Sequence, residues 1–293
     1  MIATRDRPEE LQHALASLRG LTRAGDEIVV ADSASADDRT RQVAEAAGAR
    51  YVRCEEPGAS LARNQGAQIA AGEVIAFTDD DCRPRPGWVD AIAAPYEDQE
   101  VAAVVGAVVG ADGGTAADTH HVGVPRWRWP ADPAEMGSGA SMSVRRSAFD
   151  AIGGFDERLG PGAAVAAAED HELFLRLLWA GWSVTVAPSA VVEHHDRRSR
   201  WVTLRLFYAY GLGTGTLCAM CRSLDPGHAR HLLWDRVWRN GIRLAIVDLT
   251  RGAEEAAARA VMMALGTVVG RVRGRRMRCQ RPPSTAGASP EGR

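Results

Sequence analysis

In the first third of the chain, short apolar runs alternate with segments of helical periodicity. Apolar runs followed by polar turns indicate strands, and the amphipathic segments between them indicate helices. This order predicts an α/β fold with a mostly parallel central sheet and crossover helices. The expected strands are 2–3, 28–31, 50–52, 74–77 and 101–109, the last buried on both faces, and the expected helices are 9–18, 40–47 and 61–71.

From about Trp201 the chain changes to long helical segments, expected at 201–220, 229–249 and 254–270. The glycines of the run 211–215 predict a break in the first of these helices, because glycine is a poor helix former. Residues 271–293 are rich in Arg, Pro, Gly and Ser, a composition that predicts a basic, disordered tail.

The formal net charge of −2 conceals two parts of opposite sign. Residues 1–196 carry 17 Arg against 31 Asp and Glu, whereas residues 197–293 carry 18 Arg against 6 acids. This asymmetry indicates that the two parts face different partners. Apolar residues make up 46% of the chain, and none of their runs reaches the roughly 18 residues that a membrane-spanning helix needs.

The five cysteines are scattered without the spacing of a disulfide framework, which favours a reducing, cytoplasmic compartment. Cys218 and Cys221 form a Cys-x-x-Cys pair with no second pair to complete a zinc site. We therefore expect them to be buried on one helix.

Three consecutive aspartates, Asp79, Asp80 and Asp81, follow the expected strand 74–77. Ligands of open α/β sheets bind outside the carboxyl ends of the strands, and Asp32 ends a second strand at the same edge. Clustered carboxylates repel one another unless a cation holds them, and their oxygens suit Mg²⁺ or Mn²⁺. The alternative interpretation is an acidic turn that caps the next helix.

A second acidic pair, Glu169 and Asp170, opens an expected helix. Taken alone, acids in a first turn are explained by their interaction with the helix dipole. Their position about ninety residues after an acid triplet raises the alternative that they take part in catalysis.

Several short motifs occur together in one order, and as a set they resemble family 2 glycosyltransferases of the GT-A fold over roughly residues 1–199. The resemblance implies a Rossmann-like nucleotide-diphospho-sugar transferase domain followed by C-terminal helices. The motifs are Ile2-Ala3-Thr4-Arg5-Asp6-Arg7-Pro8, Val29-Val30-Ala31-Asp32, Gly58-Ala59-Ser60-Leu61-Ala62-Arg63-Asn64, Asp79-Asp80-Asp81, Gly139-Ala140-Ser141-Met142, Gly153-Gly154-Phe155-Asp156-Glu157, Glu169-Asp170 and His194.

The resemblance implies a role for each motif residue at the donor. Thr4, Asp32 and Arg63 should hold the nucleotide, and Asp79 and Asp80 should lie near its ribose and diphosphate. Only three residues precede Thr4, fewer than a central strand usually has, so we expect the first strand to start upstream.

The resemblance also implies the metal and the catalytic groups. Asp81 should ligate the divalent metal, and His194 should complete that site, with His195 and His171 as rivals. Asp170 should act as the general base, and Glu169 should orient the acceptor. Ser141 stands where many members carry Asn beside the acceptor, so the acceptor cannot be inferred from the family.

These expectations predict a catalytic domain over residues 1–199, a helical extension over 200–270 and a tail over 271–293. The expected activity is inverting, metal-dependent transfer from a nucleoside-diphosphate sugar to a hydroxyl of a glycan, a lipid-linked acceptor or a small molecule. The alternatives are an inactive nucleotide-sugar-binding protein and a nucleotidyltransferase, which should carry a Gly-rich loop after its first strand. The Arg-rich tail could bind nucleic acid, but the acidic body and the absence of a recognised module argue against it.

The C-terminal third also carries a membrane signal. The apolar stretch 260–269 is too short to span a bilayer, and clustered arginines follow it directly. This combination predicts an interfacial helix on anionic lipid at the inner face of the plasma membrane. The alternative is that the helix packs on the catalytic domain.

Overall fold

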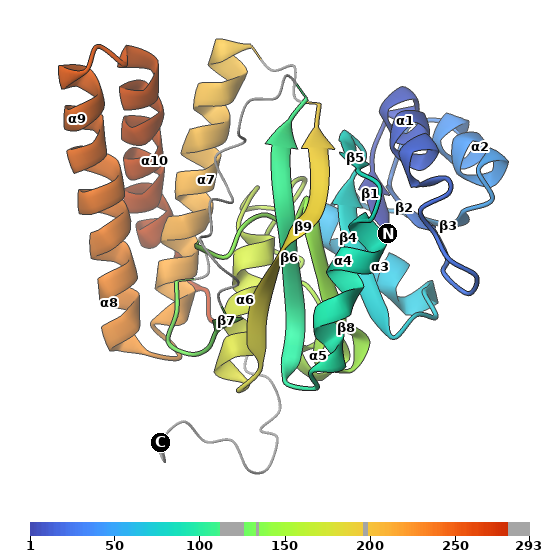
Figure 1. Ribbon diagram of the computed structural model, residues 1–293. Coiled ribbons are helices and arrows are strands. Elements are labelled where there is room, and N and C mark those ends of the chain that lie inside the picture. The colour runs from blue at the N-terminus through green and yellow to red at the C-terminus, as the bar shows by residue number, and fades with distance from the viewer. Residues whose placement is uncertain (112–125, 133–134, 196–198, 281–293) are drawn as a thin grey trace. The chain divides into compact units, whose positions relative to one another are not determined.

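The computed structural model of the protein describes residues 1–111, 126–132, 135–195 and 199–280 (Figure 1). The chain divides into two compact units. Unit 1 comprises Met1–Glu157 and Leu173–Asp196, and unit 2 comprises Arg158–Glu172 and Arg197–Gln280.

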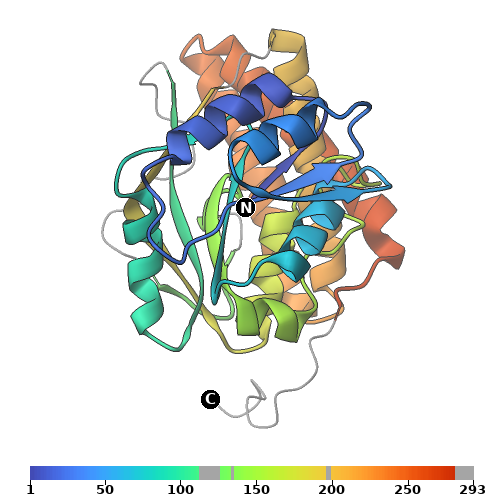
Figure 2. The same ribbon diagram turned by 90° about the vertical axis from the view of Figure 1, so that its right-hand side faces the viewer.

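Four parallel strands form the first half of the sheet in unit 1. Each strand returns to the sheet through a helix, which is how parallel neighbours are connected. Each element expected in this half is present, and Figure 2 shows α1 and α2 side by side. In spatial order the strands are β3 (Arg50–Cys54), β2 (Val29–Ser33), β1 (Ile2–Thr4) and β4 (Val74–Asp79), and the helices are α1 (Pro8–Leu18), α2 (Arg39–Ala46) and α3 (Ala59–Ile69).

The second half of the sheet mixes strand directions. Antiparallel β8 lies between β4 and β6, β9 runs parallel to β6, and the short strands β5 and β7 pair antiparallel with β9. The bounds of these strands are β5 (Cys82–Pro84), β6 (Val101–Gly110), β7 (Arg126–Trp127), β8 (Ser141–Arg145) and β9 (Ser183–His194). The remaining helices that belong wholly or partly to unit 1 are α4 (Trp88–Ala93), η1 (Ala94–Glu97), α5 (Arg146–Ile152) and α6 (Glu169–Trp179).

Large apolar side chains fill the interior of unit 1. The rings of Phe77, Phe149 and Phe155 meet with centroids 5.3 to 6.1 Å apart. Residues 101–105 of β6 are completely buried, which confirms that this strand is covered on both faces. The sheet is therefore held by a dense aliphatic and aromatic core.

Unit 2 is built mainly from long helices. α8, a π-helical segment η3 and α9 follow one another without interruption, and α10 packs against α7, η3 and α9 (Figure 1). Within the described residues, no helix has the length and apolar character needed to cross a membrane. The bounds are α7 (Arg200–Cys221), α8 (Pro226–Trp234), η3 (Asp235–Arg243), α9 (Leu244–Thr250), α10 (Glu254–Arg273) and η4 (Gly274–Arg276).

The break expected in the first C-terminal helix is wrong, because α7 continues through all three glycines. A Cβ at Gly211 would lie 2.1 Å from the carbonyl oxygen of Met263, and one at Gly215 would lie 2.0 Å from that of Thr267. The glycines therefore permit close approach of α10 rather than interrupt α7. Cys218 and Cys221 are buried on the same helix, as expected.

The two units group some residues differently from the expected domains, whose bounds stay a prediction. Residues 158–172 belong with the C-terminal helices, where Ala167 and Ala168 lie against Gly213 of α7. The expected tail begins inside α10, and its described part ends with Cys279 buried against Glu172, whose Oε1 lies 3.3 Å from the thiol sulfur. Residues 281–293 lie outside the described part of the chain.

Candidate active site

The carboxyl ends of β1 and β4 bring a hydroxyl, an arginine and two aspartates together. Ala3 pairs with Asp79 across the two strands, so the residues that follow each strand meet at one edge. Thr4 Oγ1 donates to Asp80 Oδ2 at 2.7 Å. Arg7 Nη1 donates to Asp80 Oδ1 at 2.5 Å and to Asp81 Oδ2 at 3.2 Å. Asp80 and Asp81 are thus buried and hydrogen-bonded, whereas the Asp79 side chain is 34% exposed. None of the three caps the next helix, α4, which has Gly87 at its N-cap.

Burial is the strongest influence on Asp80 and raises the pKa of its carboxyl to about 6, although Thr4 and Arg7 act to lower it. Burial also disfavours ionisation of Asp81, but the hydrogen bond and charge of His194, followed by those of Arg7, outweigh it and lower the pKa to about 2. Asp81 is therefore the carboxylate of this pair that stays ionised throughout the physiological range.

Strand pairing places His194 beside Asp81. Cys82 of β5 is the register partner of His194 at the end of β9, and the backbone amide of His195 donates to the Asp81 carbonyl at 2.9 Å. As a result, His194 Nε2 lies 3.3 Å from Asp81 Oδ1. His195 Nε2 is instead 3.9 Å from a carboxylate oxygen of Glu193.

Ligand atoms of Asp81, Cys82 and His194 lie within 4.8 Å of one another, so they could share one metal ion. Burial raises the pKa of the Cys82 thiol, and the hard cations Mg²⁺ and Mn²⁺ prefer oxygen ligands to sulfur. The effective donors are then one carboxylate oxygen and one imidazole nitrogen. This oxygen and nitrogen set fits Mn²⁺ or Mg²⁺, which complete their coordination with phosphate and water.

Asp32 is completely buried at the end of β2 and is held on both carboxylate oxygens. The Ser35 amide donates to Oδ1 at 2.8 Å, and the Tyr51 hydroxyl donates to Oδ2 at 2.6 Å. Burial, together with this bond, raises the pKa of Tyr51 to about 12. Because Thr4 is the register partner of Asp32, the two residues lie at the same edge of the sheet.

Arg63 is one of five expected donor residues, all of which lie in unit 1. It is buried on α3, and its Nη2 lies 3.0 Å from Asp79 Oδ1. Its guanidinium also stacks over the Phe155 ring, 5.6 Å from the centroid. Asp79 is therefore held by Arg63, whereas Asp80 and Asp81 are held by Arg7.

Glu169 and Asp170 lie in the first turn of α6 and belong to unit 2. Glu169 is buried, and Asp170 Oδ1 accepts from the backbone amide of His171 at 2.7 Å. His171 Nε2 is 4.0 Å from the same oxygen. Their catalytic roles stay a prediction.

Arg7 was not among the expected site residues. The sequence nevertheless contained a signal for Arg7, because a basic residue that follows one central strand should meet the acids that follow the neighbouring strand. Trp127 and Trp129 both pack against the core of unit 1, and the centroid of the Trp129 ring lies 4.9 Å from that of Trp179. Ser141 is completely buried and accepts from Trp88 Nε1 at 3.0 Å.

Comparison with known proteins agrees with this acidic sheet edge. Residues 1–153, more than half of the chain, match the family described as glycosyl transferase family 2. The protein therefore belongs to glycosyl transferase family 2.

Two curated relatives and one solved structure illustrate the similarity. The pre-mycofactocin glycosyltransferase of Mycobacterium tuberculosis is 28% identical over 224 residues, which are 71% of this chain but only 45% of the relative. The succinoglycan biosynthesis protein ExoM of Rhizobium meliloti is 26% identical over 259 residues, 80% of this chain and 77% of the relative. This chain thus spans about half the length of the first relative.

The solved structure is the mannosyltransferase PcManGT from Pyrobaculum calidifontis in complex with GDP-Man and Mn²⁺. Its TM-score is 0.59 at 17% identity, over 91% of this chain and 85% of that chain. The likeness confirms the expected α/β, GT-A fold.

Proposed function

We propose that this protein transfers a sugar from a nucleoside-diphosphate donor to a hydroxyl acceptor with inversion at the anomeric carbon. The observation that carries the proposal is the convergence of Asp81 and His194 beside the Thr4, Arg7 and Asp80 cluster. A buried carboxylate and an imidazole at the carboxyl edge of a sheet can hold a cation against a diphosphate.

In this proposal Asp81 and His194 hold a divalent metal, Mg²⁺ or Mn²⁺. The bound metal supplies Lewis-acid neutralisation of the charge that the leaving diphosphate develops. The Mn²⁺ and GDP-Man of the Pyrobaculum calidifontis structure support this choice of cofactor and donor class. Thr4, Asp32 and Arg63 hold the nucleotide, and Asp79 and Asp80 lie toward its ribose and diphosphate.

We assign the proton transfer to Asp170. The acceptor oxygen attacks the anomeric carbon, the bond from that carbon to the diphosphate oxygen breaks, and the hydroxyl proton passes to the Asp170 carboxylate. Glu169, in the same turn of α6, orients the acceptor. One displacement at the anomeric carbon gives the inverted product.

The acceptor in this proposal is a glycan or a lipid-linked saccharide of cell-envelope biosynthesis, used on the cytoplasmic side of the plasma membrane. The name of the ExoM relative, a succinoglycan biosynthesis protein, supports a polysaccharide pathway. The scattered cysteines, none of which forms a disulfide in the described residues, suit a reducing compartment.

The decisive experiment measures thermal stabilisation by UDP, GDP and dTDP with and without Mn²⁺, because a ligand that binds only the folded state raises stability. We expect one nucleotide to stabilise the protein only when Mn²⁺ is present, and Asp81→Ala and His194→Ala to remove most of that effect. His195→Ala is the matched control and should respond like the wild type.

Two results would contradict the proposal. Metal-independent nucleotide binding that Asp81→Ala leaves unchanged would remove the metal from the site. Loss of binding in His195→Ala, but not in His194→Ala, would reassign the imidazole ligand. Donor hydrolysis by the purified wild type distinguishes an enzyme from an inactive binding protein.

A further inference from the structure

The helices of unit 2 pack through their smallest residues. A Gly-x-x-x-Gly motif stands on each helix: Gly211 of α7 lies against Gly266 of α10, Gly215 against Thr267, and Gly270 against Leu212. A Cβ at Gly266 would lie 2.2 Å from the Tyr208 carbonyl oxygen. Helices that meet so closely leave no space for large side chains between them.

A set of large apolar side chains on α8, η3, α9 and α10 is nevertheless exposed. Along the path from α8 to α9, every third or fourth residue is apolar and exposed, with exposed fractions of 41% to 65%. The rings of Trp234 and Trp238 stack there, with centroids 5.7 Å apart. We define this α8–α9 stripe as Trp234, Trp238, Ile242, Ile246 and Leu249.

A second stripe runs along α10. Its members recur at intervals of three and four residues and are 45% to 53% exposed. Just before this stripe, Ala257 and Ala260 of α10 pack against Ala245 of α9. We define this α10 stripe as Val261, Leu265, Val268 and Val272.

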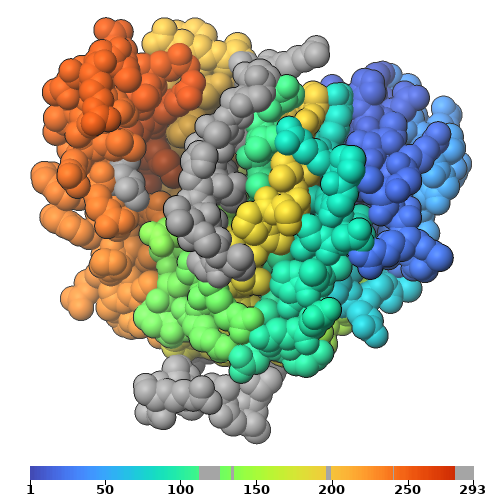
Figure 3. Space-filling model, in the orientation of Figure 1, coloured from blue at the N-terminus to red at the C-terminus, as the bar shows by residue number. Residues whose placement is uncertain are grey.

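Helix geometry places both stripes on one face. Ile246 follows the contact residue Ala245 by one position in α9, and Val261 follows the contact residue Ala260 by one position in α10. Each stripe is therefore rotated away from the alanine contact about the axis of its own helix, and the direction of rotation along the chain is the same in both helices. Because α9 and α10 are joined by a short turn and run antiparallel (Figure 1), equal rotations bring the stripes to the same side of their contact. Figure 3 shows the α8–α9 surface in orange.

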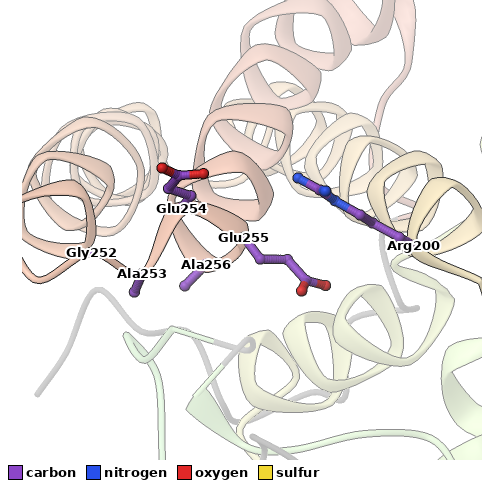
Figure 4. A pocket seen from close by; sticks show the side chains of 6 residues that line it. All are labelled: Arg200, Gly252, Ala253, Glu254, Glu255 and Ala256. Carbon is purple, nitrogen blue, oxygen red and sulfur yellow. The ribbon is translucent and has the colours of Figure 1, made fainter.

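Arginines accompany this face. Arg230, Arg239 and Arg243 are exposed along α8 and η3, and five more arginines lie at or just after the end of the α10 stripe: Arg271, Arg273, Arg275, Arg276 and Arg278. Asp235 is already paired with Arg239 at 2.7 Å. Glu254 and Glu255 line a pocket of about 340 Å³ together with Arg200, one turn or more before the α10 stripe begins (Figure 4).

We infer that the face formed by the α8–α9 stripe and the α10 stripe docks on a membrane surface that carries anionic lipid. Exposed aliphatic residues would enter the boundary of the acyl region, the two indoles would lie at headgroup depth, and the arginines would meet the phosphates. Exposure of these apolar side chains to water is unfavourable. The helices do not need them for packing, since α7, α9 and α10 already meet through glycine and alanine. The inference concerns a surface of unit 2 and does not depend on the proposed transfer reaction.

The test is co-sedimentation of the full chain with vesicles of equal parts phosphatidylglycerol and phosphatidylcholine, and with vesicles of phosphatidylcholine alone. Wild type should bind the anionic vesicles and lose binding as salt rises. Ile246→Glu combined with Leu265→Glu should weaken that binding by about tenfold or more, because each change moves a charge into the interface. The matched control is Gln12→Glu combined with Gln68→Glu, which adds the same charge at exposed positions of α1 and α3 in unit 1 and should bind like the wild type.

Folding of both variants is checked by their melting curves. A second measurement reads the position of the indoles: brominated lipid should quench wild-type fluorescence more than that of Trp234→Phe combined with Trp238→Phe.

Three outcomes would overturn the inference. Wild type could fail to bind either kind of vesicle, or the stripe variant could bind as well as the control. Alternatively, sedimentation velocity could show a dimer that the stripe variant abolishes while vesicle binding is unaffected, which would assign this face to a second copy of the chain.

Discussion

Unit 1 and unit 2 distribute their side chains in opposite ways. The interior of unit 1 holds large groups such as Phe77, Phe174 and Leu177, all of which are almost completely buried. In unit 2, α7 meets α10 through glycine and α9 meets α10 through alanine, while Trp234 is 65% exposed and Leu265 is 53% exposed. Burial of apolar area stabilises unit 1 against water, whereas unit 2 combines such burial with close backbone contact between helices.

The chemistry divides in the same way. Unit 1 carries the acidic sheet edge, where Arg7 forms ion pairs with Asp80 and Asp81. Residues 197–280 of unit 2 carry far more arginines than acids. The average composition of the whole chain therefore conceals a difference between the units. The side chains of unit 1 suit a phosphate and metal site, and those of unit 2 suit an anionic surface.

The largest effect tests how catalysis is divided between the units. Asp170→Asn should lower transfer about 10²–10⁴-fold, because the amide keeps the shape of the carboxylate but cannot accept the proton. Nucleotide binding, which the proposal assigns to unit 1, should persist in the thermal-shift assay. Asp150→Asn, which changes an exposed carboxylate of α5, should transfer at the wild-type rate. Transfer by Asp170→Asn within a few-fold of wild type would place the base elsewhere.

Removal of volume should damage unit 1. Leu177 is completely buried in the main core, so Leu177→Ala should lower the free energy of unfolding by about 2–5 kcal/mol through lost apolar contact and a residual cavity. Urea denaturation of the purified variants measures the change. A loss smaller than that of an exposed leucine would show that unit 1 repacks freely.

Addition of volume should damage unit 2. A Cβ at Gly215 would lie 2.0 Å from a backbone oxygen of α10, so Gly215→Ala should force the helices apart and cost about 1–3 kcal/mol. Gly227→Ala is the control, since its Cβ would meet only the end of the Asp225 side chain, at 3.3 Å. If Gly215→Ala melts at or above the wild-type temperature, the glycine contact does not determine this packing.

The smallest expected effect is that of Leu265→Ala, which compares an exposed leucine of unit 2 with the buried Leu177 of unit 1. Leu265→Ala removes as many atoms as Leu177→Ala, but its side chain is half exposed, so the free energy of unfolding should change by no more than about 0.5 kcal/mol. The same urea experiment compares the two leucines directly. A loss for Leu265→Ala close to that for Leu177→Ala would mean that the α10 stripe contributes to the core.

Local patterns were enough to predict the elements of the first half of the sheet. The apolar run 74–77 and the helix 9–18 both appear with small shifts at their ends, because burial of one face and the adjacent turn residues fix them locally. The sequence analysis contained no expectation for β8 or β9. Both strands take their place from partners far along the chain, so no local signal states that β8 runs antiparallel between β4 and β6.

The glycines of α7 show why a local rule can fail. Considered alone, Gly211 and Gly215 predict a weak helix, and the contacts of α10 more than fifty residues later reverse that expectation. Tertiary packing outweighs helix propensity here, because a propensity difference of about 1 kcal/mol per glycine is smaller than the gain from a long helix contact.

The sequence by itself determined the kinds of residue in the candidate site and their order: a threonine and an aspartate after two early strands, an acid triplet after a third, an acidic pair opening a helix and a late histidine. Only the tertiary structure decided which of these side chains meet. It selected His194 over His195 as the neighbour of Asp81, and it brought Arg7 into the cluster. The reason is that strand register sets the side-chain neighbours, and register depends on pairings between residues far apart in the chain.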